Sequence, residues 1–415
     1  MTVRATVLAV VACVTLTGFG NSLGASISDG ALAGDPMPLC LRTLQRTPNG
    51  RRIPVDAWRR YTDSLTIDST VLAHLNAQPE FTQPVWDYVA VIADDERVAD
   101  GQRAMVQYRE VLDAIQQRTH VDPATIVAIW GVESNFGRGA GTMSVLRSLA
   151  TLSCAGRRQQ YFRGEFFSAL RIVEAGHIQP EQFLGSWAGA FGQTQFMPGS
   201  FERLAVDQDG DGRKDVISNV GDALASTANY LQHAGWQADA SWGVEVRTPK
   251  SLLTTPHVEG RRAKHAMAAW AARGVRLVDG RPLSAVVRDS AALAGLFTPT
   301  GPDGPAFLVM RNFDAVFHYN ASVSYTLAVS HLADRIRGGG PFVAAWPTTD
   351  LGLSRADRRE LQTLLAQRGH PVGAPSGVLT AATRSAIRAE QQRLGVVVTG
   401  RAGQQLLARL RNAHS

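Results

Sequence analysis

Apolar residues recur at helical spacing over much of the chain. Between about residues 100 and 231 they return every three or four positions, with interruptions, which predicts a series of amphipathic helices. Residues 325–336 predict one further helix of this kind. Only short runs, such as 244–246 and 307–310, favour strands. The pattern therefore predicts a mainly α fold with small β elements.

Glycine and proline divide the chain near its C-terminal end. Three glycines and a proline at 338–341 end the helical pattern, since this combination breaks any regular helix. Beyond them, apolar stripes return in a module of about sixty residues and predict small helices. We therefore expect a large domain over residues 34–340, a linker over 341–349 and a small helical domain over 350–412.

The first 33 residues have the composition of an export signal. Arg4 is the sole charge before Asp29, and the apolar run at 5–16 suits a signal-peptide core but is short for a membrane span. Ala31-Leu32-Ala33 fits a cleavage site, so we expect a signal peptide at 1–33 and export to the periplasm or cell envelope. Residues 10–13 loosely resemble a lipoprotein box, which leaves a lipid anchor as the less favoured alternative.

Composition narrows the class of protein. The 415 residues are 45% hydrophobic and 19% charged, which excludes a disordered or fibrous chain and allows two or three domains. The net charge of +6 is compatible with an anionic polymer and equally with ordinary surface charge, and without a recognisable basic helix we expect no nucleic-acid partner. Three cysteines exclude a disulfide-dense scaffold. Export leaves Cys40 and Cys154, which are predicted to form a disulfide or, alternatively, to remain buried thiols.

One predicted helix ends in an acidic residue on its apolar face. Asp122-Pro123 is a strong helix start, and the helix is expected to run over 124–135. Its stripe at helical spacing consists of Ile126, Ile129, Trp130 and Glu133. A carboxyl group beside apolar side chains loses hydration, which favours its protonated form near neutral pH and suits a general acid acting on a glycosidic oxygen. The alternative is that Glu133 lies in water or pairs with Arg138.

A second segment, residues 185–198, is a poor regular helix. It contains three glycines and ends in a proline, a composition that suits a groove where backbone approaches a ligand closely. Its aromatic residues, Trp187, Phe191 and Phe196, could offer apolar faces for sugar rings, although taken alone such aromatics more often belong to a core. Its polar residues, Ser186, Gln193 and Gln195, offer hydrogen bonds.

Five stretches together resemble the lytic murein transglycosylases of the membrane-bound type B family. They are 128–137, 186–190, 192–198, 228–231 and 319–322 followed by Tyr325, and the resemblance extends over roughly residues 37–340. It implies a lysozyme-like fold and cleavage of the β-1,4 bond between N-acetylmuramic acid and N-acetylglucosamine in peptidoglycan. It implies Glu133 as the catalytic residue. The groove-lining residues that it implies are Ser186, Gln195, Tyr230, Tyr319, Asn320 and Tyr325.

The family resemblance also implies a reaction with a single carboxylate. Glu133 would protonate the leaving oxygen and then deprotonate the C6 hydroxyl, giving a 1,6-anhydromuramyl end without consuming water. A second carboxylate, from Glu165 or Glu174 on the following helix, would favour a hydrolytic muramidase instead. A non-catalytic wall-binding protein is the third alternative.

A motif of alternating acids predicts a cation site. Asp207, Asp209 and Asp211 precede Gly212 in a D-x-D-x-D-G pattern, which places carboxylate oxygens around a hard cation. Arg213 would contribute its backbone carbonyl. Position twelve of the loop is a serine, so Asp222 is the expected last ligand, as the family resemblance also implies. We predict structural Ca²⁺, with Na⁺ or a solvated acidic turn as alternatives.

The C-terminal module is similar to the peptidoglycan-binding type 1 domain, a three-helix unit. A Leu-Gln pair, a Gly turn, Gly-Val-Leu and Thr-Arg-x-Ala-Ile appear in the order typical of that domain over about 350–412. Two departures are Ser376 in place of the usual Asp and Glu390 in place of the usual Phe. The resemblance implies tethering to peptidoglycan glycan strands. We expect a monomer, and other cell-wall enzymes stay open as partners.

Overall fold

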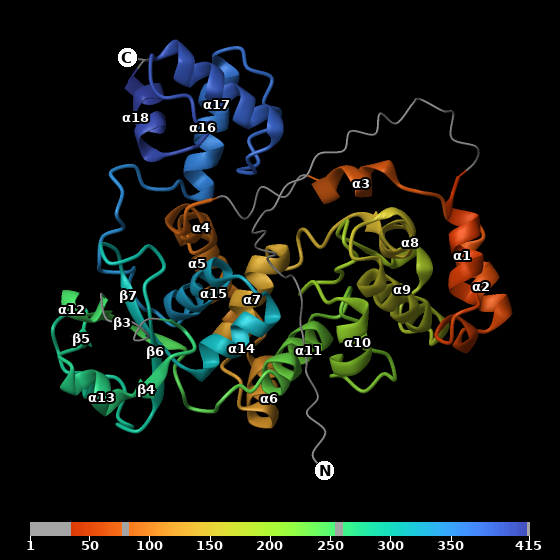
Figure 1. Ribbon diagram of the computed structural model, residues 1–415, viewed down its shortest axis with the longest axis horizontal. Helices are drawn as coiled ribbons and strands as arrows, with labels where there is room; N and C mark the ends of the chain where they lie inside the picture. The colour runs from red at the N-terminus through yellow and green to blue at the C-terminus, as the bar shows by residue number, and fades with distance from the viewer. Residues whose placement is uncertain (1–34, 77–82, 254–259, 413–415) are drawn as a thin grey trace, which may run out of the picture. The chain divides into compact units, whose positions relative to one another are not determined.

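The structure, a computed structural model, describes residues 35–76, 83–253 and 260–412 (Figure 1). The expected signal peptide at 1–33 lies outside these residues. The described chain forms two compact units, one made of residues 35–76 and 129–230 and the other of 83–128 and 231–412. Among the described residues, no helix combines the length and apolar composition that a membrane crossing requires.

The first unit, residues 35–76 and 129–230, is helical. Its elements are α1 (Met37–Gln45), α2 (Val55–Thr62), α3 (Ser69–Asn76), the end of α7 (Pro123–Ser134), α8 (Val145–Ala155), α9 (Gln159–Glu174), α10 (Pro198–Leu204) and most of α11 (Val220–His233). The short strands β1 (Met143–Ser144) and β2 (Leu184–Gly185) pair antiparallel. Helices α8 and α9 pack together because each turns a continuous apolar face inward, with Leu149 and Phe166 fully buried. A disulfide joins Cys40 of α1 to Cys154 of α8.

The second unit, residues 83–128 and 231–412, combines helices with a small sheet. Its helices before the C-terminal module are α4 (Val85–Ile92), α5 (Asp95–Gln107), α6 (Arg109–Thr119), α12 (Lys250–Leu253), α13 (Met267–Ala272), α14 (Arg311–Tyr319) and α15 (Val323–Ile336). Five strands, β3 (Gly243–Arg247), β4 (Lys264–Ala266), β5 (Arg276–Leu277), β6 (Leu293–Phe297) and β7 (Ala306–Val309), form an antiparallel sheet in the order β4-β6-β7-β3-β5. Trp270 of α13 is fully buried in the core that covers this sheet.

The mainly α fold with small β elements is confirmed, but helices before residue 100 were not predicted. The chain around 41–60 is basic and polar, so the apolar stripes of α1 and α2 are short and easily overlooked. The overlooked signal is proline, because Pro36, Pro54 and Pro84 stand directly before α1, α2 and α4. Proline is favoured at the start of a helix, where its missing N–H costs no hydrogen bond.

The segment expected as a linker packs onto the second unit. The ring of Phe342 stacks on His331 of α15 with 3.8 Å between ring centroids. The ring centroids of Trp346 and Trp86 of α4 are 6.4 Å apart. Burial lowers the pKa of His331 to about 3, so this ring is neutral at physiological pH. Residues 341–349 therefore join the core of this unit through aromatic contacts instead of acting as a free tether.

The C-terminal module contains α16 (Arg355–Gln367), α17 (Ala381–Arg393) and α18 (Gln404–Asn412) around its own apolar core. Both departures from the type 1 pattern are accommodated. The hydroxyl of Ser376 accepts a hydrogen bond from the Val378 N–H at 3.2 Å. Glu390 is buried, and its carboxylate binds Arg393 at 2.8 Å and His370 at 2.9 Å, which replaces the apolar packing of a phenylalanine by paired charge.

Ion pairs join the C-terminal module to α4 and α5. Arg401 donates two hydrogen bonds of 2.7 Å to the carboxylate of the buried Asp87. Arg355 binds the carboxylate of Asp94 at 2.9 Å. Burial alone would raise the pKa of Asp94, but the hydrogen bonds from Arg355 and from the Arg97 N–H lower it overall. The contact between the module and these helices is therefore polar and charge-paired.

We expect Arg401→Met to destabilise the protein by about 2 kcal/mol, because it leaves the carboxylate of Asp87 buried without its partner. Urea unfolding followed by circular dichroism measures this loss. Arg409→Met is the matched control, since Arg409 is exposed on α18. Equal unfolding midpoints for the two variants would show that the Asp87–Arg401 pair is energetically neutral.

Candidate active site

Glu133 lies in the last turn of α7, where the helix leaves the core. The observed helix, Pro123–Ser134, agrees with the predicted range to within one residue at each end. Residues 124–130 are buried on every side of the helix, so the predicted stripe is not a separate apolar face but part of a helix buried all round. Glu133 itself is half-buried. The acidic group therefore stands at the border between an apolar core and the surface.

Three consecutive residues with positive φ redirect the chain directly after the last residue of α7. Asn135, Phe136 and Gly137 have φ values of 51°, 58° and 81°. This turn brings the ring of Phe136 back against Trp130 in an edge-on contact of 5.6 Å. A Cβ atom at Gly131 would lie 2.6 Å from that ring, so glycine is required there. The turn thus fixes where the helix end, and with it Glu133, is held.

Ser134 ties this helix end to the glycine-rich segment 186–198. Its hydroxyl donates a 2.5 Å hydrogen bond to the carbonyl of Gln193 and accepts one of 2.8 Å from the Gly137 N–H. Ser134 is buried, so both bonds are shielded from water. The structure therefore brings the predicted catalytic residue and the predicted groove segment together.

The 186–198 segment is irregular, as its composition predicted. Isolated β-bridges join Gly185 to Phe191 and Phe191 to Phe196. Gln195 has a φ of 53°, and its side-chain amide donates hydrogen bonds of 2.9 Å to the carbonyls of Ala140 and Gly192. The hydroxyl of Ser186 accepts a hydrogen bond from the Ala190 N–H. Both polar side chains are half-buried on a backbone that is held in place by local bonds.

Several candidate contacts in this segment lie inside the protein. Phe191 and Phe196 are 0% and 3% exposed, so of the two alternatives for these rings the core position is the observed one, and they offer no face to a sugar ring. Gln193 is also buried and donates to the carbonyl of Ile217 at 3.2 Å, which gives it a bracing role in the loop. Trp187 remains half-buried and stacks on His74 with 6.2 Å between ring centroids.

Glu165 and Glu174, the candidate second carboxylates, have different environments on α9. Glu174 is exposed. Glu165 accepts a 2.7 Å hydrogen bond from the Gly199 N–H in the first turn of α10, and burial raises its pKa. This carboxylate is thus engaged at the start of a neighbouring helix, where the helix dipole favours negative charge.

The implied tyrosine and asparagine residues come from both units. Tyr230 on α11 is buried edge-on against Phe196 with 6.1 Å between centroids, and burial raises its pKa to about 12. In the other unit, Tyr319 ends α14 and the half-buried Asn320 follows it. Tyr325 is buried in the first turn of α15, where its N–H donates to the N-cap residue Ser322. Each of these polar side chains therefore lies in a helix or directly after one.

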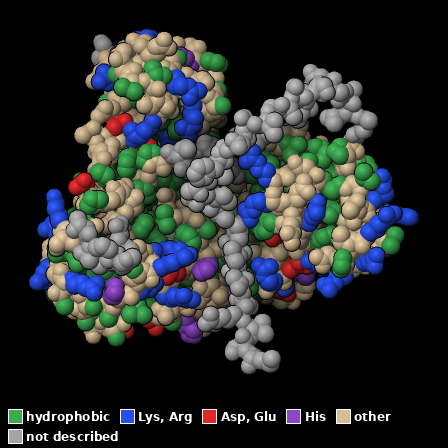
Figure 2. Space-filling model, viewed as in Figure 1, with side chains coloured by type: hydrophobic (Ala, Val, Ile, Leu, Met, Phe, Trp, Pro, Cys, Tyr) green, Lys and Arg blue, Asp and Glu red, His purple; other side chains and the backbone are tan. Residues whose placement is uncertain are grey.

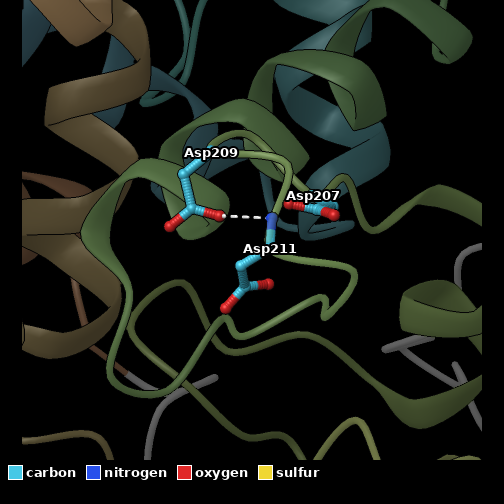
Figure 3. A group of neighbouring side chains, drawn as sticks. All are labelled: Asp207, Asp209 and Asp211. Carbon is cyan, nitrogen blue, oxygen red and sulfur yellow. Dashed lines mark hydrogen bonds between the residues drawn. The ribbon is translucent and has the colours of Figure 1, made fainter.

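The acidic loop places three carboxylates together (Figure 3). One oxygen from each of Asp207, Asp209 and Asp211 lies within 4.8 Å of the others. The Asp207 carboxylate accepts hydrogen bonds from Gly212 and Gly210 at 2.8 and 2.7 Å. Partial burial alone would raise the pKa of Asp207, but these bonds lower it overall. The loop therefore holds three carboxyl groups close together, as a hard cation requires of its oxygen ligands.

Asp222, the predicted last ligand, lies at the start of α11 and contacts the backbone of the loop. It is fully buried, and its two oxygens accept 2.7 Å hydrogen bonds from the backbone N–H groups of Gln208 and Asp215. It is not a member of the three-carboxylate cluster, and it stabilises the loop through these two hydrogen bonds. Burial, opposed by these two hydrogen bonds, raises its pKa.

Sequence reasoning missed Asn219 as a member of the loop. Its side-chain amide donates a 2.8 Å hydrogen bond to Asp209. Arg213 donates its backbone N–H to Asp211, and its guanidinium binds the carbonyl of His177. Asparagine is a common capping residue, and its position just before α11 was the available signal.

Comparisons with known families match both parts of the chain. The model of the family described as "Transglycosylase SLT domain" matches residues 39–334. The model described as "Putative peptidoglycan binding domain" matches residues 354–410.

Individual proteins similar to this chain include lytic transglycosylases. The chain is 34% identical over 242 residues to membrane-bound lytic murein transglycosylase B of Escherichia coli, covering 58% of this chain and 64% of that relative, which is less than two thirds of its length. The structure of SltB3 from Pseudomonas aeruginosa in complex with NAG-anhNAM-pentapeptide superposes with a TM-score of 0.71 at 42% identity, over 91% of this chain and all of that one. The E. coli lytic transglycosylase Slt35 in complex with calcium gives a TM-score of 0.62 at 28% identity, over 74% and 95% of the two chains.

Proposed function

Because this chain belongs to the transglycosylase SLT family, we propose that it is a lytic transglycosylase of peptidoglycan. It cleaves the β-1,4 bond between N-acetylmuramic acid and N-acetylglucosamine. The observation that carries this proposal is the placement of Glu133: a half-buried acid at the end of an apolar helix, with the next residue bonded to the groove segment. A carboxyl group in such a border position can hold a proton and still reach a ligand.

The proposed reaction uses Glu133 twice. As an acid it protonates the glycosidic oxygen, so that the bond from C1 of the muramyl residue breaks and the glycan leaving group departs with the proton. The N-acetyl group of the muramyl residue stabilises the positive charge that develops at C1. As a carboxylate, Glu133 then takes the proton of the C6 hydroxyl, whose oxygen attacks C1. The product is a 1,6-anhydromuramyl end, and intramolecular attack is favoured by high effective concentration.

The substrate-binding residues in this proposal are polar groups on ordered backbone. Ser186 and Gln195 belong to the segment bonded to Ser134, and both are half-buried. Tyr230 would contribute a hydroxyl that stays protonated, since burial raises its pKa to about 12. The family resemblance also implies Tyr319, Asn320 and Tyr325, which belong to the second unit.

We propose Ca²⁺ as a structural ion of the acidic loop. Asp207, Asp209 and Asp211 would bind it through carboxylates and Arg213 through its backbone carbonyl, while Asp222 and Asn219 hold the loop by hydrogen bonds. Hard oxygen ligands of this kind suit Ca²⁺. The ion would have no part in the chemistry, and the related Slt35 structure contains calcium.

We expect 1 mM Ca²⁺ to raise the melting temperature by several degrees relative to protein in EDTA. At a calcium concentration 100 times Kd, binding to the native state alone stabilises it by about 2.7 kcal/mol. The increase should disappear in Asp209→Asn/Asp211→Asn, measured by scanning calorimetry. Asp239→Asn, an exposed aspartate outside the loop, is the matched control. The same calcium response in the loop variant and the control would refute the site.

The remaining assignments follow from the family and the sequence. We propose a signal peptide at 1–33, a catalytic domain at 34–340, a linker at 341–349 and a peptidoglycan-binding domain at 350–412. The protein would be exported to the periplasm or cell envelope and act there as a monomer on glycan strands. Binding of the C-terminal domain to the wall would raise the local substrate concentration.

The proposed function is tested by the chemistry of the released products. Purified protein is incubated with peptidoglycan sacculi, and the soluble muropeptides are weighed by mass spectrometry. Anhydromuramyl ends are the expected product. Reducing ends would identify a hydrolytic muramidase, and the absence of soluble product would identify a wall-binding protein.

A further inference from the structure

A large cavity lies beside the sheet of the second unit, among residues that the proposed catalytic site does not use. Its volume is about 1020 Å³. The wall is formed by the segment 237–241, by Lys264 of β4, by residues 286–289, by Leu293 of β6 and by the start of α14. A cavity of this size can take several amino-acid residues of a ligand.

Three cations line this cavity: Lys264, Arg288 and Arg311. The ammonium group of Lys264 has three donors, of which one binds Asp314 at 3.0 Å and one binds the carbonyl of Val309 at 3.1 Å. Its third donor has no partner among the described residues. Arg288 and Arg311 are exposed, and neither forms an ion pair within the described chain.

The neighbourhood of the cavity carries excess positive charge. Asp314 is buried and already binds Arg261 at 2.6 Å in addition to Lys264. Figure 2 shows blue side chains gathered beside a histidine in the region where Figure 1 places α14. Burial lowers the pKa of His318 on this helix, and Arg311 lowers it further, so His318 does not add charge at neutral pH. Two acidic residues, Asp239 and Asp289, also line the cavity, so basic side chains outnumber acidic ones there.

The rest of the wall is apolar. Val286 and Leu293 are 52% and 57% exposed, and both line this cavity. Val287 and Ala292 lie between them and are half-buried, and Met310 closes the wall. Exposed apolar side chains next to cations suit a ligand that combines carboxylates with small apolar groups.

We propose that this cavity binds the peptide stem of peptidoglycan through its carboxylates. The proposal rests on the proposed function, since the stem is covalently attached to the muramyl residues of that substrate. Such a stem is a short peptide that carries several carboxylates next to alanine methyl groups. Arg288, Arg311 and the third donor of Lys264 would bind carboxylates, and Val286 and Leu293 would contact the methyl groups.

The test is calorimetric binding of a synthetic stem pentapeptide, L-Ala-γ-D-Glu-meso-diaminopimelate-D-Ala-D-Ala, to the full chain. Arg288→Glu and Arg311→Glu should each weaken binding at least about tenfold, because a lost charge-assisted hydrogen bond and a new repulsion both act on the carboxylates. Arg276→Glu is the matched control, because it makes the same charge change on β5, at the opposite edge of the sheet from β4. Its binding should equal that of the parent protein. Arg288 has no contact on which folding depends among the described residues, so at least this variant should remain folded.

Several outcomes would overturn this proposal. Equal weakening by all three substitutions would indicate a general charge effect, and no weakening in Arg288→Glu and Arg311→Glu would place the peptide elsewhere. Binding to phosphatidylglycerol vesicles without binding to the peptide would identify a lipid surface instead. The assay is independent of catalysis, so peptide binding without release of anhydro ends from sacculi would refute the proposed function alone.

Discussion

Glu133→Gln is expected to abolish the release of anhydromuropeptides from sacculi, with the rate falling at least about a thousandfold. The amide has nearly the same shape as the carboxyl group, so the turn at 135–137 and the Ser134–Gln193 hydrogen bond should remain intact. It can neither donate a proton to the glycosidic oxygen nor accept one from the C6 hydroxyl. Because both steps of the proposed reaction use the same group, no other step bypasses the loss.

The measurement is mass spectrometry of products over time, with unfolding curves to show that each variant is folded. Glu174→Gln is the matched control, since Glu174 is exposed on α9, and it should retain full activity. Glu165→Gln separates the single-carboxylate reaction from a hydrolytic one. Its amide oxygen can still accept from the Gly199 N–H, so product type should not change. Loss of activity in Glu165→Gln, together with reducing ends in the parent protein, would favour a second catalytic carboxylate.

The sequence predicted the candidate site best where the signal is local. Asp122-Pro123 and Gly137 mark the two ends of α7, and the apolar residues between them recur at helical spacing. The predicted helix therefore agrees with the observed one to within a residue at each end. The irregular course of 186–198 was predicted for the same reason, because glycines with positive φ, such as Gly189 and Gly192, act on their own backbone.

Predictions failed where the outcome depends on contacts distant in sequence. The sequence pattern does not decide whether Phe191 faces a ligand or the core, since its contacts with Phe183 and Phe201 depend on how the chain folds back around it. Only two of the five strands were predicted from the sequence, because β4 and β5 are three and two residues long and β6 carries Gly295 at its centre, which weakens a strand pattern. The two short strands exist through pairing with β6 and β3, which their own composition does not encode.

Asp222 shows how a correct position can have a different role. The spacing identified an acid at the start of α11 as part of the cation loop, and the structure does place it there. Its oxygens are directed to the N–H groups of Gln208 and Asp215, a choice that depends on the folded path of the loop. Sequence spacing identifies which residues meet, whereas the direction in which each carboxylate points depends on the folded path of the loop.

The disulfide between Cys40 and Cys154 is expected to make the largest single contribution to stability. It joins residues 114 positions apart, and closing a loop of this length in the unfolded chain is worth about 4 to 5 kcal/mol in the chain-entropy model. The double variant Cys40→Ala/Cys154→Ala should therefore unfold at a much lower urea concentration than the oxidised parent. Since α1 packs on α8 and its Met37, Leu41 and Leu44 are buried, the loss should begin with detachment of this helix.

Reduction provides the internal control for the disulfide. The parent protein with dithiothreitol should unfold at the same urea concentration as the double variant, and dithiothreitol should not affect the double variant, because the effect is due to the cross-link and not to the side chains. A parent protein that is equally stable with and without the reductant would contradict the prediction. A loss near 4 kcal/mol is a large share of the 5–15 kcal/mol that is typical of folded domains. The proposed export to an oxidising compartment would then be a condition for the stable fold as well as for access to the wall.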